Sequence, residues 1–271
     1  MSLAVYISCI LSGMMTYFID FIVKCSLILQ NMLSNPSIAV EQITVVKSKG
    51  VIPIILDTMK TSHDIDFLEG ACGAIKNMAI NTEAREAIGK CDGSIETIIS
   101  LVESNFDTAV SKGALDALKV LACDEENRNQ MKLSNGMEII ITFVTNSIDE
   151  LDVVGIGLNL LLEFTRSDDM LDYGDVFHLI TSAMEKYRNN STIQEAGCQI
   201  LGNLLLKNEE ESQRAVETIL TSIKNHYDDG DVQSSGLCAL LSVCSDYPST
   251  AKLLRTKDYF SVLCKSQLKI G

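Results

Sequence analysis

Apolar residues recur at helical spacing through most of this chain. The segment that begins at Gly93 has apolar residues at intervals of three and four positions: Ile95, Ile98, Ile99 and Val102. This spacing places the apolar side chains on one face of a helix. Three further segments of the same kind begin at Gly50, Gly136 and Gly174. The pattern predicts a series of amphipathic helices.

Two segments far apart in the chain are similar to one another. Glu69 to Ala79 reads EGACGAIKNMA, and Glu195 to Leu205 reads EAGCQILGNLL. Each has a glutamate, small residues, a cysteine and an apolar pair before an asparagine. Asn77 and Asn203 are 126 residues apart, which is three periods of 42. A period of about 40–47 residues is typical of armadillo and HEAT repeats.

Other copies of this segment carry different residues at the asparagine position. The positions that correspond to it are occupied by Asn31, Val120, Leu162 or Glu163, and Ser242. Short charged helices are predicted at Thr82 to Ile88 and Glu125 to Met131. Residues suited to the N-cap precede the third helices: Ser62 or Asp64, Asp107, and Ser191. Small residues early in these helices, among them Gly70, Gly113 and Gly155, predict close crossing with neighbouring helices.

The glycine at the start of the second helix, the three-helix unit and the third-helix asparagine together resemble the armadillo family. The resemblance predicts an all-α superhelix of about six three-helix repeats near 42 residues. Residues 1–17 are expected to form a hydrophobic N-terminal helix, and residues 18–271 the solenoid with a partial last repeat. With only three prolines and sixteen glycines, the composition permits long helices and argues against a sandwich or barrel.

In the armadillo family the third helices line a concave groove, and their asparagines hydrogen-bond the backbone of an extended peptide. An amide side chain can donate and accept, so one asparagine can pair with both backbone groups of a bound strand. Carried over to this chain, the resemblance predicts a partner-binding groove lined by polar and acidic residues. These are Asn31, Glu69, Asn77, Asp116, Glu195, Gln199 and Asn203.

One departure from the family's import adaptors bears on the partner. Those proteins carry tryptophan four residues before the asparagine, where it holds lysine side chains. The corresponding residues here are Leu27, Gly73 and Gln199, and the chain has no tryptophan. Binding of an import signal in the usual way is therefore not expected.

The net charge of −14 opposes contact with a phosphate backbone, so nucleic acid is excluded as a principal partner. The same charge would attract a basic peptide, although it also suits the solubility of an extended surface. The expected partner is another protein or peptide, with an extended segment that is basic or polar.

No catalytic, cofactor or metal residues are predicted. The nine cysteines are scattered, and none form a Cys-x-x-Cys pair. This pattern favours a reducing compartment, the cytoplasm or the nucleus. Cys72 and Cys198 fall in apolar helical segments and are expected to be buried and unpaired.

The segment from Leu3 to Ile19 is almost entirely apolar. It is somewhat short for a membrane span and contains Gly13, so a buried first repeat is the favoured interpretation. The predicted function is a non-enzymatic interaction scaffold. The alternatives are a membrane-tethered adaptor that uses this segment, and a small-GTPase regulator or transport adaptor built on the same fold.

Overall fold

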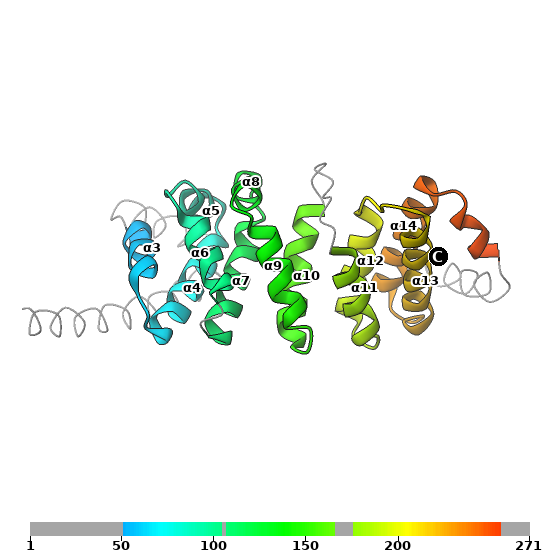
Figure 1. Ribbon diagram of the computed structural model, residues 1–271, viewed down its shortest axis with the longest axis horizontal. Helices are drawn as coiled ribbons and strands as arrows, with labels where there is room; N and C mark the ends of the chain where they lie inside the picture. Colours follow the sequence, from blue (N-terminus) through cyan, green and yellow to red (C-terminus); the bar gives the residue numbers. More distant parts are fainter. Residues whose placement is uncertain (1–50, 105–106, 166–175, 256–271) are drawn as a thin grey trace, which may run out of the picture. The chain divides into compact units, whose positions relative to one another are not determined.

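The computed structural model describes residues 51–104, 107–165 and 176–255. These residues form twelve α-helices and one short 3₁₀ helix, and no strand occurs among them (Figure 1). The chain divides into two compact units, which meet in sequence between Ile140 and Ile141. The predicted first helix, at 1–17, lies outside the described residues.

The first unit repeats a short helix, an amphipathic second helix and a long third helix. The helices α3 (Val51–Thr61) and α4 (Ile65–Ala79) are a second and a third helix. A complete repeat follows, with α5 (Thr82–Gly89), α6 (Ser94–Glu103) and α7 (Thr108–Leu121). The next repeat begins with α8 (Glu125–Leu133) and continues with α9 (Gly136–Asn146), in which the first unit ends.

Three third helices lie within the described residues of the second unit. These are α10 (Leu151–Thr165), α12 (Ser191–Asn203) and α14 (Gly230–Asp246). The second helix α11 (Val176–Lys186) packs against α12, and η1 (Thr250–Arg255) packs against α13 and α14.

One repeat of the second unit has two helices instead of the expected three. A single helix of 17 residues, α13 (Glu209–Asn225), lies in sequence between α12 and α14. In the preceding repeats a residue such as Gly93, with a φ of 67°, separates the first helix from the second. No glycine or proline interrupts Glu209–Asn225, so the helix continues through this region.

The third helices begin with matching caps. The side chains of Asp64, Asp107, Asn190 and Asp229 each accept a hydrogen bond from a backbone N–H in the first turn. The predicted caps at Asp64 and Asp107 are confirmed. The prediction of Ser191 is wrong by one residue, because Asn190 accepts from the Ile193 N–H at 3.0 Å and Ser191 is the first helical residue.

A buried polar residue four positions after the cap ties each of three third helices to its second helix. Gln194 donates from Nε2 to the Met184 carbonyl at 2.8 Å and to the Tyr187 carbonyl at 3.2 Å. Gln233 donates to the Ile223 and His226 carbonyls in the same arrangement. In the first unit Ser111 donates to the Leu101 carbonyl at 3.0 Å. These bonds bring a side-chain donor to carbonyl groups at the end of the second helix; the Tyr187 and His226 carbonyls also accept from the Asn190 and Asp229 N–H groups.

Arginines make a second repeated contact, at the turn from a third helix into the following first helix. Arg85 of α5 donates to the Ala79 carbonyl at 3.0 Å, and Arg128 of α8 donates to the Ala122 carbonyl at 2.6 Å. The two arginines are 43 residues apart, as are the two alanines. The repeat is therefore present in individual hydrogen bonds as well as in helix order.

In the second unit, Gly157, Gly197 and Gly236 allow close helix packing, and Gly157 lies two positions after the predicted Gly155. A Cβ at Gly157 would lie 2.4 Å from Val144, and one at Gly197 or Gly236 would meet Met184 or Ile223 as closely as 2.5 and 2.6 Å. Each of these pairs joins a third helix to a second helix. At Gly155, which the sequence favoured, a Cβ would meet only Ile193 at 4.0 Å, so that prediction is wrong in position. At Gly113 a Cβ would lie 3.3 Å from the Cys72 side chain, so this glycine does mark a close approach.

Candidate partner-binding surface on the third helices

The third helices of each unit lie side by side. In the first unit α4 packs against α7, and in the second unit α12 packs against both α10 and α14. The sequence repeat assigned asparagine to one position in each third helix. This position lies thirteen residues after the residue that precedes the helix. It is occupied by Asn77, Val120, Glu163, Asn203 and Ser242, and we call it the ladder position. Leu162 is 6% exposed and belongs to the core, so the ambiguity left by the sequence is resolved in favour of Glu163.

Asn77 is the most enclosed polar residue at the ladder position. Its side chain is 7% exposed, and it makes no side-chain hydrogen bond within the part of the chain that the structure describes. Its two amide atoms are both reached by solvent, since the fully enclosed polar atoms that lack a partner belong to other residues. Both its donor and its acceptor are therefore available to a bound backbone.

Asp116 is paired with two lysines of the protein itself, whereas the sequence predicted a carboxylate that contacts the partner. Its carboxylate lies 2.5 Å from Lys76 Nζ of α4 and 2.7 Å from Lys119 Nζ of its own helix. Partial burial acts to raise the pKa of Asp116, but hydrogen bonds and charges from Lys119 and Lys76 outweigh it, and the pKa is lowered. The carboxylate is ionised and already paired with two cations, so it is a weaker attractant for a basic partner than the sequence implied.

Glu195 and Gln199 are adjacent on α12 and are tied to the next third helix. Gln199 Nε2 donates to Glu195 Oε1 at 3.1 Å and to Ser235 Oγ of α14 at 3.0 Å. The amide nitrogen is thus engaged within the protein, while its carbonyl oxygen and the Glu195 carboxylate remain as acceptors. Sequence reasoning missed Ser235, although it lies 36 residues after Gln199, close to one repeat.

Asn203 is exposed and reaches the preceding third helix. Its Nδ2 donates to Thr165 Oγ1 of α10 at 3.5 Å, and that hydroxyl donates to the Leu162 carbonyl. Asn203 therefore offers chiefly its carbonyl oxygen, whereas Asn77 offers both groups. Of the other predicted residues, Glu69 is exposed on α4 and Asn31 lies outside the described residues.

Comparison with known proteins supports the fold. No protein-family model and no curated protein matches the sequence. Among solved structures, a designed armadillo repeat protein is similar with a TM-score of 0.57 and 14% identity, over 75% of this chain and 86% of that one. The fold is that of an armadillo repeat protein.

Two engineered proteins from the Northeast Structural Genomics Consortium are also similar. The first matches with a TM-score of 0.64 and 20% identity, over 92% of this chain and 66% of that one. This chain thus spans just under two thirds of that protein's length. The second matches with a TM-score of 0.53 and 21% identity, over 82% of this chain and 90% of that one. These similarities confirm the predicted all-α armadillo-like solenoid and identify no particular member.

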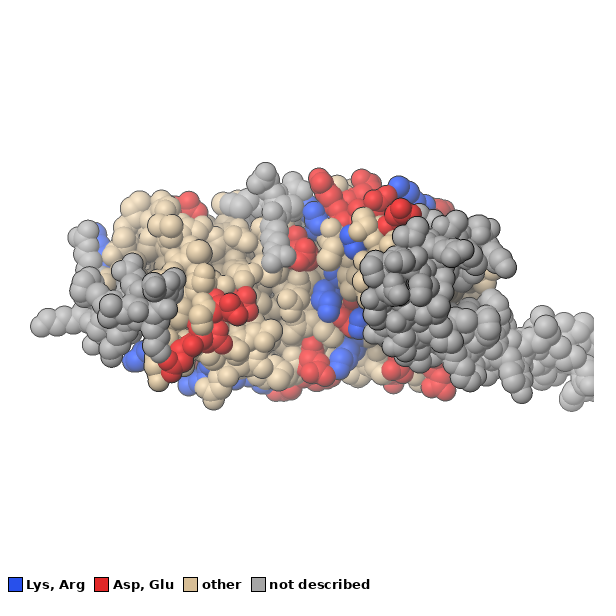
Figure 2. All heavy atoms as spheres, turned by 180° about the vertical axis from the view of Figure 1, so that it is seen from behind, with Lys and Arg blue, Asp and Glu red and all other residues tan. Residues whose placement is uncertain are grey.

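The armadillo third helices of the two units differ in charge. Helices α4 and α7 contain three lysines and three acidic residues, whereas α10, α12 and α14 contain no lysine or arginine. The acidic residues of the latter three are Asp152, Glu163, Glu195, Asp231 and Asp246. On the face drawn in Figure 2, acidic side chains form a band within largely uncharged surroundings, and basic ones appear elsewhere.

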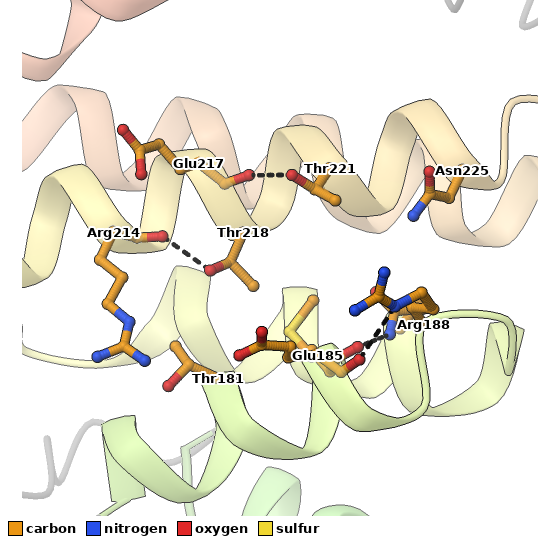
Figure 3. A pocket seen from close by; sticks show the side chains of 10 residues that line it. Thr181, Glu185, Arg188, Arg214, Glu217, Thr218, Thr221 and Asn225 are labelled. Carbon is orange, nitrogen blue, oxygen red and sulfur yellow. Dashed lines mark hydrogen bonds between the residues drawn. The ribbon is translucent and has the colours of Figure 1, made fainter.

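A cleft on the other side of the second armadillo unit lies between α11 and α13 (Figure 3). It has a volume of about 310 Å³, and its lining includes Glu185, Arg188 and Arg214. The hydroxyls of Thr218 and Thr221 donate to carbonyls of their own helix, each at 2.8 Å. No histidine, cysteine or serine is among the residues that line the cleft.

Residues 51–104, 107–165 and 176–255 contain neither a cluster of metal ligands nor a membrane-spanning helix. No three His, Cys, Asp or Glu side chains come together there in a way that would hold a metal ion. No helix in these ranges has the length and hydropathy needed to span a bilayer. The apolar segment at residues 3–19 lies outside the described residues.

Proposed function

We propose that this chain is a non-catalytic adaptor that binds an extended segment of another protein along its third helices. Armadillo-like repeat folds generally act as protein-interaction scaffolds, and the fold is of that kind. The observation that carries the proposal is Asn77, whose amide is nearly enclosed and makes no hydrogen bond within the described residues. A peptide strand supplies the N–H and C=O groups that would pair with it.

The residues around the second unit's third helices favour a segment with basic side chains. Helices α10, α12 and α14 carry acidic residues and no basic ones. The amide nitrogens of Gln199 and Asn203 are engaged internally, which leaves oxygen acceptors at the surface. Lysine and arginine carry several donors and no acceptor, so they complement such a surface. The proposed contact residues remain Asn31, Glu69, Asn77, Asp116, Glu195, Gln199 and Asn203.

Selection of binding peptides tests this proposal. Random 16-residue peptides displayed on phage would be selected against the full chain, and the affinity of synthetic copies measured by isothermal titration calorimetry. We expect Asn77→Ala to weaken binding by about 5- to 150-fold, which corresponds to about 1–3 kcal/mol for an unpaired buried group. The control is Glu96→Ala, on the exposed side of the second helix α6.

Two further readouts bear on the same surface. Asn203→Ala should weaken binding less than Asn77→Ala, because Asn203 already pairs with Thr165. Selected sequences should be enriched in lysine and arginine, and their affinity should fall with added salt. If Glu96→Ala weakens binding while Asn77→Ala does not, the partner uses the second-helix side and the proposal is wrong.

A further inference from the structure

One side of α14 is exposed along the whole helix. The residues on it recur at intervals of three and four positions: Asp231, Ser234, Cys238, Leu241 and Ser245, all of them exposed. We call this side the α14 edge. Leu241 is 72% exposed although it lies in the interior of a helix. The edge is separate from the ladder position of α14, where Ser242 is partly buried.

The corresponding side of α12 is covered by α14. Leu241 is the twelfth residue after its N-cap, and the twelfth residue in α12 is Gly202. A Cβ at Gly202 would lie 2.8 Å from Ala239 Cα, so α14 packs on α12 at that point. In the first unit the twelfth residue, Lys76 of α4, contacts Asp116 of α7. This side of a third helix is therefore a helix-packing side, and none of the described helices occupies it on α14.

The edge differs from α12 in a way that restricts what can pack there. Gly202 lets the backbone of α14 approach closely, whereas Leu241 projects a branched apolar side chain at the same position. A helix on the α14 edge must stand further away and receive Leu241 between its own apolar side chains, as in knobs-into-holes packing. A helix with only polar or small residues on its contacting face would not surround Leu241 with apolar side chains.

The charges of α14 indicate which residues would flank the apolar face of a helix that packs on the edge. Asp231 and Asp246 are exposed near the two ends of α14, and the helix contains no lysine or arginine. We propose that the α14 edge docks an amphipathic helix of another protein, whose apolar face receives Leu241 and whose flanks carry lysine or arginine. Packing of the apolar face supplies affinity, and the basic flanks select the partner and speed association. This surface does not include the ladder position and does not depend on Asn77.

The experiment uses the full chain and a synthetic 17-residue peptide with leucines on one helical face and lysines elsewhere. Two matched peptides replace every lysine with glutamate, or place proline at two interior positions. Fluorescence anisotropy should give saturable binding of the lysine peptide at low micromolar concentration or below. Binding of the other two peptides should be at least about ten-fold weaker, because one repels the acidic edge and the other cannot form a helix.

Matched variants of the chain locate the binding. Leu241→Ser should weaken binding by about ten-fold or more, because a buried leucine contributes about 1.5–3 kcal/mol. Leu133→Ser removes a leucine that is 88% exposed at the end of α8, and should change the affinity less than two-fold. Asp231→Asn should weaken binding more than Asp92→Asn, an equal change in charge at an exposed site in the first unit. High salt should remove this difference.

Several outcomes overturn the proposal. Equal effects of Leu241→Ser and Leu133→Ser, equal binding of the proline peptide, or no saturable binding would each contradict it. If Leu241→Ser lowers the free energy of unfolding of the unbound chain, the chain covers its own edge. If the same variant converts a dimer into a monomer in light scattering, the occupant is a second copy of this chain. A loss of binding with Asn77→Ala but not Leu241→Ser would assign the peptide to the groove.

Discussion

The Lys76 ammonium lies 2.5 Å from the Asp116 carboxylate and so joins α4 to the next third helix, α7. The two residues are 40 positions apart, close to one repeat. The contact makes Asp116 part of the packing between third helices, in addition to any role in binding a partner.

We expect Asp116→Asn to destabilise the chain by about 1 kcal/mol near pH 6, since paired charges at partly exposed sites contribute about that much. The pKa of Asp116 is lowered from the ordinary value of 3.8 in the folded state. Its contribution to stability is therefore complete above that value and is lost as the pH falls through the lowered pKa. The free energies of unfolding of the wild type and the variant, measured in urea, should converge as the pH is lowered further below 3.8. A pH-independent difference would show that the asparagine acts by another route.

The buried glutamines offer a second test. Gln194→Ala and Gln233→Ala each remove two hydrogen bonds to carbonyls of a second helix. We expect each to lower the free energy of unfolding by about 1–3 kcal/mol, because the carbonyls lose buried partners. Gln213→Ala, at an exposed position of α13, is the control and should change stability by less than about 0.5 kcal/mol. Similar values for all three variants in chemical denaturation would argue against this role.

Two glycine-to-alanine substitutions should have opposite signs. A Cβ at Gly157 would lie 2.4 Å from the branched Val144 side chain, and we expect Gly157→Ala to destabilise the chain by about 1–3 kcal/mol. A Cβ at Gly73 would meet nothing within 4 Å, so Gly73→Ala should stabilise the chain by up to about 1 kcal/mol. Thermal unfolding of the two variants measures the difference. A stabilising Gly157→Ala would contradict the packing between α9 and α10.

Thiol labelling tests the core around the third helices. Cys72 and Cys198 are buried and unpaired, which confirms the sequence prediction, and burial raises the pKa of each thiol to about 12. The charges of Glu69 and Glu195 act in the same direction. At pH 8 both should stay unlabelled in the native chain, while the exposed Cys123 and Cys238 react. Mass spectrometry of the digested protein identifies the labelled positions, and urea should make all four reactive.

The armadillo-like fold could be predicted from the sequence for two reasons. Apolar residues recur at helical spacing, and Asn77 and Asn203 are separated by a whole number of repeats. The sequence analysis did not predict that α13 takes the place of a separate first and second helix. The signal for it is the absence of glycine between Asn208 and Asn225. Glu163 could not be distinguished from Leu162 until helix packing showed which of the two is buried.

The candidate surface was predicted as a set of positions, but the state of each residue was not. A stripe of polar residues at helical spacing says where side chains lie, and it does not say which of them pair with one another. Asp116 is paired with Lys76, and Gln199 is paired with Ser235, each across a distance of about one repeat in sequence. Such contacts depend on how two third helices are aligned, which the spacing within one helix does not determine.

Hydrogen bonds between adjacent repeats affect whether such a chain can gain or lose repeats. Gln130 donates to the Gly89 carbonyl, Tyr187 to the Ile148 carbonyl, and the His226 ring pairs with the Arg188 carbonyl. Each bond spans 38 to 41 residues and so reaches only the adjacent repeat. A duplicated or excised repeat would meet the same kind of donor and acceptor at its new junction, and no distant group would lose a partner. Growth and shortening by whole repeats are thus compatible with the bonding within each unit, whereas an insertion of half a repeat would leave both sides of the junction unpaired.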